Sequence, residues 1–307
     1  MNIKGNRGIK SNNGIKSNRP IKNNRGIKRD RQIKSDRGIK RDWNIIRNIR
    51  FIGLLAKLKL SQSMVFRLTF FGAFFVDGSL FIMQLLMFNA IYSQVDTIGD
   101  WGRGQMLIFV GTFSLLNAIN MTVYFFGVNA IPSKIKSGDL DHYLTKPINP
   151  LLRLTFESVN MGSFPLVFFS IGIILYGISV QGMGVSTFHG LLYLLFILLM
   201  ALLYYDLEVI LRTIPFFVVS ASSIERLEGA MFDLCMRIPG VVFKGVFKLI
   251  FYAVLPYGLM ATIPTQILTR SLSVEGMLYA AAVVIVFTFL TFWFWKFGLK
   301  HYKSASS

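Results

Sequence analysis

The most regular feature of the sequence is a series of long apolar runs separated by shorter polar segments. Runs of about 20 apolar residues match the roughly 30 Å hydrocarbon core of a bilayer. We therefore predict an all-α integral membrane protein with six transmembrane helices in a membrane domain over residues 68–300. The predicted spans cover residues 68–91, 106–128, 158–180, 188–219, 241–263 and 277–297.

The run at 188–219 fits either one long helix or two short helices in a hairpin, because 32 residues extend about 48 Å as a helix. The basic residues decide between them, since Lys and Arg are enriched in cytoplasmic loops. With the N-terminus in the cytoplasm and residues 1–42 left aside, one long helix places 16 basic residues inside and only Arg103 and Arg270 outside. A hairpin would move four of the 16 outside, namely Arg226, Arg237, Lys244 and Lys248. We therefore predict one helix, and cytoplasmic N- and C-termini with a short tail at 301–307.

Residues 1–42 form a basic leader in which Ile-Lys recurs every six residues from Ile3 to Ile39. A hexapeptide period can indicate a β-helix. Here each repeat offers one apolar residue, too little to offset roughly 1–2 kcal/mol of backbone entropy per residue, so we predict disorder. Residues 43–67 alternate isoleucine and leucine with arginine and lysine at near-helical spacing. This pattern predicts an amphipathic helix in contact with membrane lipid at the interface; the alternative is a helical extension of the first span.

The net charge of +18 comes almost entirely from the N-terminal part of the chain. Residues 1–67 hold 19 of the 33 basic and 3 of the 15 acidic residues, whereas the other 240 residues hold 14 basic and 12 acidic ones. The leader could bind anionic lipid or RNA. The basic leader could equally be an expanded sequence repeat that has no role in the cytosol. We expect no nucleic-acid partner.

Composition and motifs argue against enzymatic chemistry on this chain. It is 53% hydrophobic and 16% charged, whereas soluble proteins average about 25% charged residues. The single cysteine excludes a disulfide scaffold. No HExxH zinc motif, GxSxG nucleophile elbow or phosphate-binding loop with its lysine occurs. We expect no catalytic residue, no bound cofactor and no metal on this chain.

The longest inner loop, residues 131–157, has the pattern of a turn followed by a short helix. Gly138 breaks the incoming helix, Asp139 can cap the next one and Pro147 stops it. Leu140, Tyr143 and Leu144 are spaced to share one apolar face, which could contact a soluble partner. Many membrane loops contain a short surface helix without a partner, so both interpretations stay open on this pattern alone.

Residues 135–149 read IKSGDLDHYLTKPIN, which resembles the I-x-x-G-x-L-D-x-x-L-x-x-P-x-N signature of ABC-2-type transporter permeases. The matching positions are Gly138, Leu140, Asp141, Leu144, Pro147 and Asn149. Weaker matches lie at Arg67, residues 99–101, 255–257 and 263–264, and in the tail after Tyr302. The leader lies outside the family pattern.

The resemblance implies the transmembrane subunit of an ATP-binding cassette exporter in the cytoplasmic membrane. ATP and magnesium would be bound by a separate ATPase subunit, and a second copy or a sister permease would complete a dimer. The 131–157 loop would dock the ATPase through Leu140, Tyr143 and Leu144, with Asp139 and Asp141 as caps or as partners for basic residues. The alternative is an ATP-independent secondary transporter or channel, and the cargo cannot be named from the sequence.

Charged residues inside the predicted spans need a reason, because a charge at mid-bilayer costs about 2.5–3.5 kcal/mol on insertion scales. Asp77 could line a pathway or pair within the dimer. Glu208 and Arg212 lie four apart on one helix face, which favours a self-contained ion pair over a substrate site. Asp206 faces elsewhere and is the better candidate for lining a wet cavity.

Overall fold

The computed structural model describes residues 52–55, 57–58, 67–182, 184–218 and 222–302. The predictions for residues 1–42 and for the tail after 302 lie outside these ranges, as does most of 43–67, of which residues 52–55 and 57–58 are helical. The described part is built from helices. Four of them are long and apolar enough to cross a membrane: Arg103–Val123, Met161–Gln181, Thr187–Phe216 and Val274–His301.

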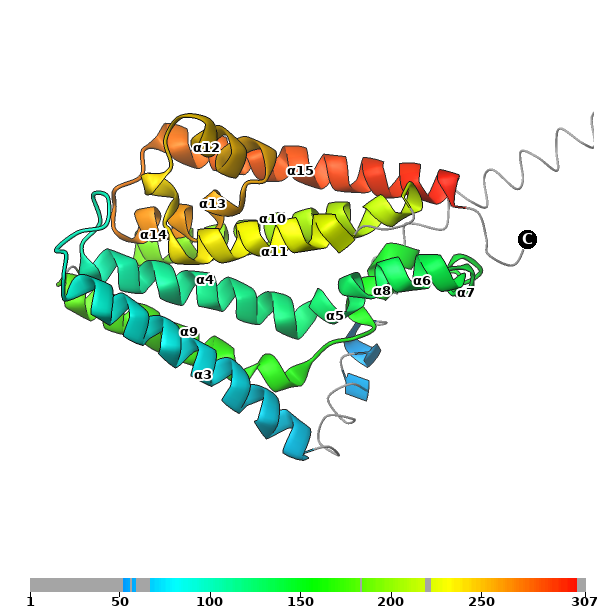
Figure 1. Ribbon diagram of the computed structural model, residues 1–307, viewed down its shortest axis with the longest axis horizontal. Helices are drawn as coiled ribbons and strands as arrows, with labels where there is room; N and C mark the ends of the chain where they lie inside the picture. Colours follow the sequence, from blue (N-terminus) through cyan, green and yellow to red (C-terminus); the bar gives the residue numbers. More distant parts are fainter. Residues whose placement is uncertain (1–51, 56, 59–66, 183, 219–221, 303–307) are drawn as a thin grey trace, which may run out of the picture. The chain divides into compact units, whose positions relative to one another are not determined.

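These long helices run lengthwise beside one another (Figure 1). They are α4 (Arg103–Val123), α9 (Pro165–Gln181), α10 (Thr187–Thr213) and α15 (Val274–His301), accompanied by the 26-residue α3 (Arg67–Tyr92). A 3₁₀ turn, η1 (Met161–Ser163), precedes α9, and another, η2 (Ile214–Phe216), continues α10. The prediction of one long helix at 188–219 is therefore confirmed. The apolar core lies where α4, α10 and the segments after α10 meet.

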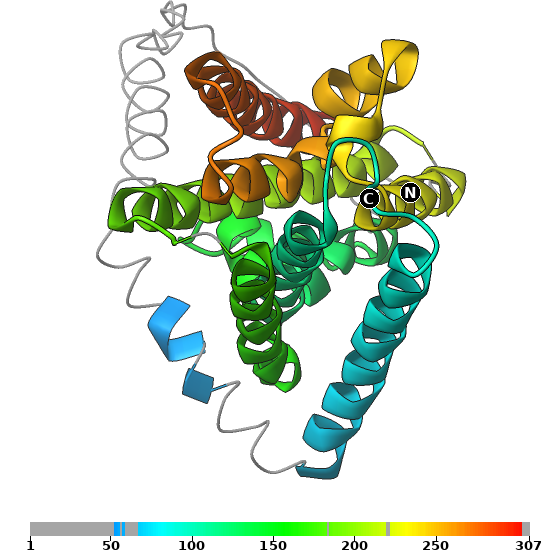
Figure 2. The same cartoon turned by 90° about the vertical axis from the view of Figure 1, so that its left-hand side faces the viewer.

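Four short helices follow α4 at one end of this body, which we call the loop end: α5 (Phe125–Asn129), α6 (Ile131–Ser137), α7 (Asp141–Leu144) and α8 (Pro150–Phe156). The opposite end, which we call the far end, carries the links between α3 and α4 and between α9 and α10. Figure 2 looks onto the far end.

Helices α4 and α9 pack backbone to backbone because glycines lie between them. A Cβ atom on Gly111 would lie 2.7 Å from Ile174, and one on Gly177 would lie 2.8 Å from the backbone nitrogen of Ile108. Small residues of this kind allow close contact where lipid removes the hydrophobic driving force between helices. The 131–157 loop connects the ends of this closely packed pair.

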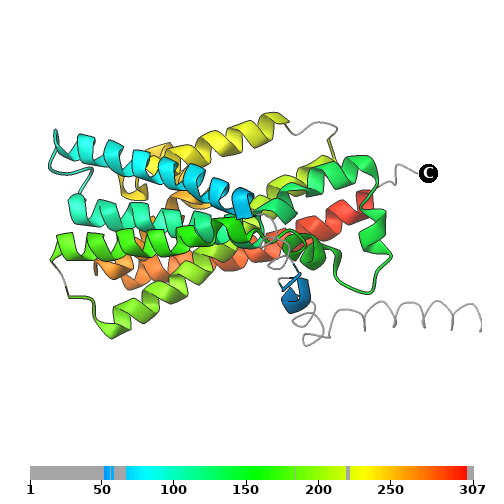
Figure 3. The same ribbon diagram turned by 90° about the horizontal axis from the view of Figure 1, so that it is seen from below.

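The polar segment 220–240, expected as a cytoplasmic link, is a helix packed along the body. This helix, α11 (Ser222–Arg237), runs antiparallel to α10, from the loop end toward the far end (Figure 3). Arg212 near the end of α10 contacts Glu228, and Tyr204, two turns earlier, stacks on Phe232 at 5.3 Å between ring centroids. The next residues reach the far end, where Val242 lies 3.3 Å from where a Cβ of Gly99 would be.

The predicted fifth span at 241–263 is not one straight helix. After the 3₁₀ turn η3 (Gly240–Val242), the segment contains α12 (Gly245–Leu249), the π-helix η4 (Ile250–Val254), α13 (Tyr257–Met260) and α14 (Thr262–Leu268). The halves Gly245–Val254 and Tyr257–Leu268 meet at 80°. Pro256, which has no N–H to continue the helix, lies at the bend.

Both ends of this broken segment lie at the far end. Gly240 donates its N–H to Thr262 Oγ1 at 2.8 Å, and Arg270 donates to the carbonyl of Gly184 in the link between α9 and α10 at 3.1 Å. The segment therefore enters and leaves the body at the same end. The helix that runs the length of the body at this point in the chain is α11, and not the predicted span at 241–263. Three of the four basic residues assigned to the inner side, Arg237, Lys244 and Lys248, consequently belong to the far end.

Candidate functional site: the loop between α4 and α9

The 131–157 loop is a compact unit because each of its short helices ends or begins at a specific residue. Gly138 ends α6 with φ +81°, a left-handed conformation that glycine adopts without strain. This confirms the predicted break. At α8, the side chain of Asn149 accepts a hydrogen bond from the Leu151 N–H at 2.9 Å, and Pro150 occupies the first helical position.

The expected roles of Asp139 and Pro147 in the short helix are not seen. The residue before α7 is Leu140, and no side chain caps the helix. Asp139 instead accepts a hydrogen bond from the Ser137 hydroxyl at 2.7 Å. Helix α7 ends at Leu144, three residues before Pro147, so the proline follows the helix without terminating it directly.

The three apolar residues of the short helix do not form one outward face. Leu140 is 0% exposed and Tyr143 is 6% exposed, whereas Leu144 is 37% exposed. The two buried side chains join a core cluster with residues of α5, α6 and α8 and with Val209 of α10 and Trp295 of α15. Leu140 and Tyr143 thus lie in an apolar core that the loop shares with the long helices, and of the three only Leu144 is exposed.

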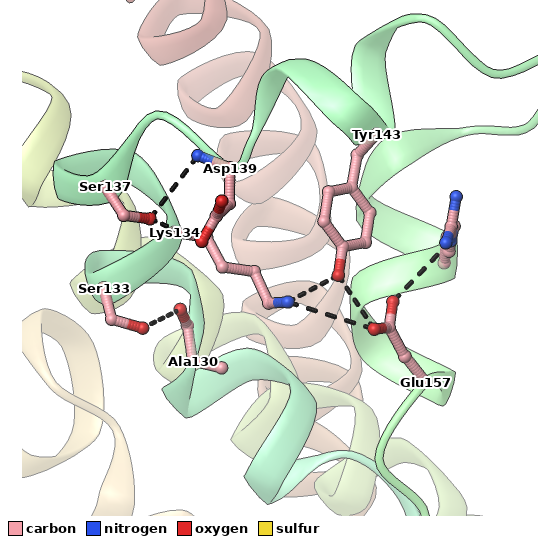
Figure 4. A network of polar contacts seen from close by, with 8 residues as sticks. Ala130, Ser133, Lys134, Ser137, Asp139, Tyr143 and Glu157 are labelled. Carbon is pink, nitrogen blue, oxygen red and sulfur yellow. Dashed lines mark hydrogen bonds and ion pairs between the residues drawn. The ribbon is translucent and has the colours of Figure 1, made fainter. Parts of the chain in front are cut away.

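A polar network around Tyr143 links three of the short helices (Figure 4). The ring lies between Lys134 of α6 and Arg153 of α8, whose charged groups are 4.6 and 4.7 Å from its centroid. The hydroxyl donates to Glu157 Oε1 at 2.8 Å and accepts from Lys134. Glu157 also pairs with Lys134 at 3.9 Å and with Arg153 at 3.6 Å. Burial raises the pKa of Tyr143, and Glu157 adds to the rise, so the phenol stays protonated at neutral pH.

The outward surface of the loop, which we call the docking face, consists of polar residues around Leu144. Asp141 is half-buried beside the end of α15, where burial and this carboxylate both raise the pKa of Tyr302. The exposed residues are Lys136, Ser137, Asp139, His142, Leu144, Thr145, Lys146, Pro147 and Asn149.

The family model of the "ABC-2 family transporter protein" matches residues 79–306, about three quarters of the chain. The chain belongs to this family. No curated protein and no solved structure matches it significantly. Permeases of the ABC-2 family generally work with ATPase subunits, and the match includes the whole 131–157 loop. Family membership and the long apolar helices together identify this ABC-2 protein as a multi-pass membrane permease.

The charged residues within the body of the ABC-2 permease are paired more widely than their spacing indicated. Glu208 and Arg212 form the predicted i, i+4 ion pair at 3.6 Å. This pair is not self-contained, because Arg212 also donates to Glu228 of α11 at 2.5 Å and to Asn129 of α5 at 3.0 Å. The sequence carried no signal for this second carboxylate, because Glu228 lies 16 residues from Arg212 in a segment expected to be a loop.

The two other predicted carboxylates have different positions. Asp206 is 1% exposed and accepts a hydrogen bond from Thr288 of α15 at 2.6 Å, so it is turned into the contact between α10 and α15 and not into an open cavity. Asp77 lies in α3, and its side chain is outside the described part of the structure. A pathway-lining role for Asp77 stays a prediction.

Replacing Tyr143 with phenylalanine is expected to loosen the docking face without unfolding the permease. The change removes the hydrogen bond to Glu157 and leaves the ring between its two cations, so the expected cost is about 1 kcal/mol. Hydrogen exchange of backbone amides at 141–157 should become roughly five-fold faster. The same substitution at the exposed Tyr176 of α9 is the control. Unchanged exchange at 141–157 would show that the network does not hold the loop.

Proposed function

We propose that this protein is the permease subunit of an ATP-binding cassette exporter in the cytoplasmic membrane, driven by ATP hydrolysis on a separate ATPase that docks on the 131–157 loop. ATP and magnesium would be bound by that ATPase, and a second copy or a sister permease would complete the transporter. The observation that carries the proposal is the construction of the loop. Leu140 and Tyr143 are buried in a core shared with α10 and α15, while Leu144 and its polar neighbours remain exposed.

A rigid loop of this kind can transmit force. A push on the docking face reaches Val209 of α10 and Trp295 of α15 through the side chains of the shared core, without passing through a flexible segment. Packed interiors transmit displacement because they are nearly incompressible. ATP-driven movement of the docked ATPase would in this way reach the helices that surround the transport pathway.

The proposed membrane topology keeps six crossings and changes the fifth. Helices α3, α4, α9, α10, α11 and α15 would cross, with the loop end and both termini in the cytoplasm and the broken α12–α14 segment re-entering from outside. The Lys and Arg residues of the loop support this orientation. The ion pair between Glu228 of the polar helix α11 and Arg212 of α10 supports its place against the body, because it compensates a buried charge on this helix.

Changing Leu144 to aspartate is expected to abolish capture of the ATPase by the tagged permease from its native membranes. The substitution places a charge at the centre of the docking face, on a side chain that is already exposed, so the fold should persist. The measurement is the vanadate-sensitive ATPase activity that co-purifies with the permease, expected to fall at least tenfold. Leu140→Asp is less informative, because Leu140 is fully buried and its loss would disrupt the loop itself.

Leu144→Met, which keeps the apolar volume, is the matched control and should retain the captured activity. Equal ATPase capture by Leu144→Asp would contradict docking at this face. Cargo transport that persists in vesicles without any captured ATPase would instead support the ATP-independent alternative.

A further inference from the structure

A cavity of about 610 Å³ lies beside α11, with α3, α4 and α10 as its other main walls. Its size is within the range of about 300–1,000 Å³ typical of small-molecule sites. Helix α11 turns a stripe of residues toward it that recur every three or four positions, from Glu225 through Glu228 and Phe232 to Met236. This stripe of acidic and apolar side chains therefore lines a space that is partly open at the surface of the permease.

The ionisable groups on the cavity wall carry an excess of negative charge. Four carboxylates and two guanidinium groups line it: Glu208, Glu225, Glu228, Asp233, Arg212 and Arg237. Among the residues that the structure describes, no group of three or more His, Cys, Asp or Glu could hold a metal ion. The acidic excess is thus dispersed over the wall and suits an organic cation better than a coordinated metal.

The deepest part of the wall leaves one carboxylate oxygen without a hydrogen bond. Arg212 is shared between Glu208 and Glu228, and Glu228 also accepts a hydrogen bond from Tyr257 at 3.3 Å. Glu208 is 3% exposed, and its Oε2 lies 3.6 Å from Arg212 Nη2, beyond hydrogen-bond distance, with no donor among the described residues. With two carboxylates around one guanidinium group, this end of the wall carries a net negative charge, which favours a positively charged group nearby.

The rest of the cavity lining consists mainly of methionine and aromatic side chains. Methionines contribute flexible, polarizable thioethers that adapt to ligands of different shape. Phe232 and Tyr204 stack on each other and add aromatic surface to the wall. The methionines concerned are Met83, Met87, Met121 and Met236. Such a wall fits the hydrophobic body of a ligand whose charge lies near Glu208.

From these features we propose that the cavity binds amphipathic organic cations and that this is the class of compound the permease transports; the second part rests on the proposed transport function. The charged group would lie against Glu208 and Glu228, and the apolar body between the methionines and the two rings. Glu225 and Asp233, exposed on α11, would attract the cation toward the entrance.

The test uses two ions of the same shape and opposite charge, tetraphenylphosphonium and tetraphenylborate. Binding to the full chain in phosphatidylcholine nanodiscs is measured by equilibrium dialysis, with empty nanodiscs subtracted. We expect saturable binding of the phosphonium and no binding of the borate beyond the empty discs. Glu208→Gln should weaken phosphonium binding at least tenfold, and the double variant Glu225→Gln/Asp233→Asn about tenfold. Glu275→Gln, at the start of α15 and away from the cavity, should bind like the original protein.

The double variant keeps the test decisive if Glu208→Gln does not fold, because Glu225 and Asp233 are exposed. Equal binding of the two ions, or phosphonium binding unchanged in these variants, would overturn the proposal. No ATPase takes part in the assay, so a negative result here leaves ATPase docking intact. Loss of docking in the Leu144→Asp experiment would likewise leave cation binding intact.

Discussion

Replacing Arg212 with methionine is expected to destabilise the permease by about 3–5 kcal/mol, because it breaks a buried cluster of charges. Arg212 is the only basic residue within ion-pair distance of Glu208 and Glu228 in the part of the chain that the structure describes. Both carboxylates are at most 7% exposed. Methionine would fill much of the space and leave two buried carboxylates without a counter-charge. The ion pair between Arg212 and Glu228, which joins α11 to α10, would be lost as well.

The thermal stability of the purified protein measures this effect. The single cysteine, Cys235, is 2% exposed on α11, so a thiol-reactive dye reports when this helix separates from the body. The midpoint should fall by about 10 °C, since 1 kcal/mol corresponds to roughly 2–4 °C in domains of 150–250 residues. Adding Glu208→Gln and Glu228→Gln to Arg212→Met should recover most of the loss. A triple variant as unstable as the single one would show that packing, and not unpaired charge, is responsible.

Changing Gly127 to alanine is expected to displace α8 and to cost up to about 3 kcal/mol. A Cβ atom at this position in α5 would lie 2.1 Å from the carbonyl oxygen of Leu154 and 2.7 Å from that of Thr155. Both of these oxygens belong to the backbone of α8, so the clash cannot be relieved by a side-chain rotation. The two helices must separate, and with them the attachment of the docking face to α10.

Two measurements check this prediction. Hydrogen exchange at 150–157 should become at least ten-fold faster in Gly127→Ala, and ATPase capture should fall with it. Gly172→Ala is the matched control, because a Cβ at that glycine of α9 would have no neighbour within 4 Å. Normal exchange in Gly127→Ala would mean that α5 and α8 can shift apart without loosening the loop.

Much of the fold could be predicted from the sequence, because apolar length is a strong signal. It indicated the long helices α4, α9, α10 and α15. The single helix at 188–219 was predicted as well, although three of the four basic residues used to favour it, Arg237, Lys244 and Lys248, lie at the far end. Helix α11 was missed for a physical reason. Its charges resemble those of a solvated loop, and the one that is buried, Glu228, is compensated by Arg212 of another helix. No local rule relates two residues at that separation.

The broken segment shows that apolar composition alone does not distinguish a straight crossing helix from a bent one. Residues 241–263 are apolar enough for a crossing helix, and a segment that enters and returns at one end needs the same apolar surface. Pro256 in the sequence could have indicated the break, but the 80° bend and the hydrogen bond from Gly240 to Thr262 depend on the packed structure.

The short helix of the 131–157 loop could be predicted, but the direction of its apolar side chains could not. The spacing of Leu140, Tyr143 and Leu144 predicts their helix, and Gly138 marks the break before it. Spacing does not say whether an apolar side faces a partner or the chain itself. The structure answers this, because Leu140 and Tyr143 are buried in one cluster with residues of α10 and α15. The polar network around Tyr143 had no sequence signature.

Helix α10 touches both extremities of the permease. Its 27 residues, about 40 Å of helix, contact the 131–157 loop through Val209 near one end and also pack against α13 and α14 of the broken segment. A rigid tilt of this helix about its midpoint would move the two extremities in opposite directions. Displacing the loop end inward would then move the broken segment outward, so that an opening at one extremity would close as an opening at the other widened.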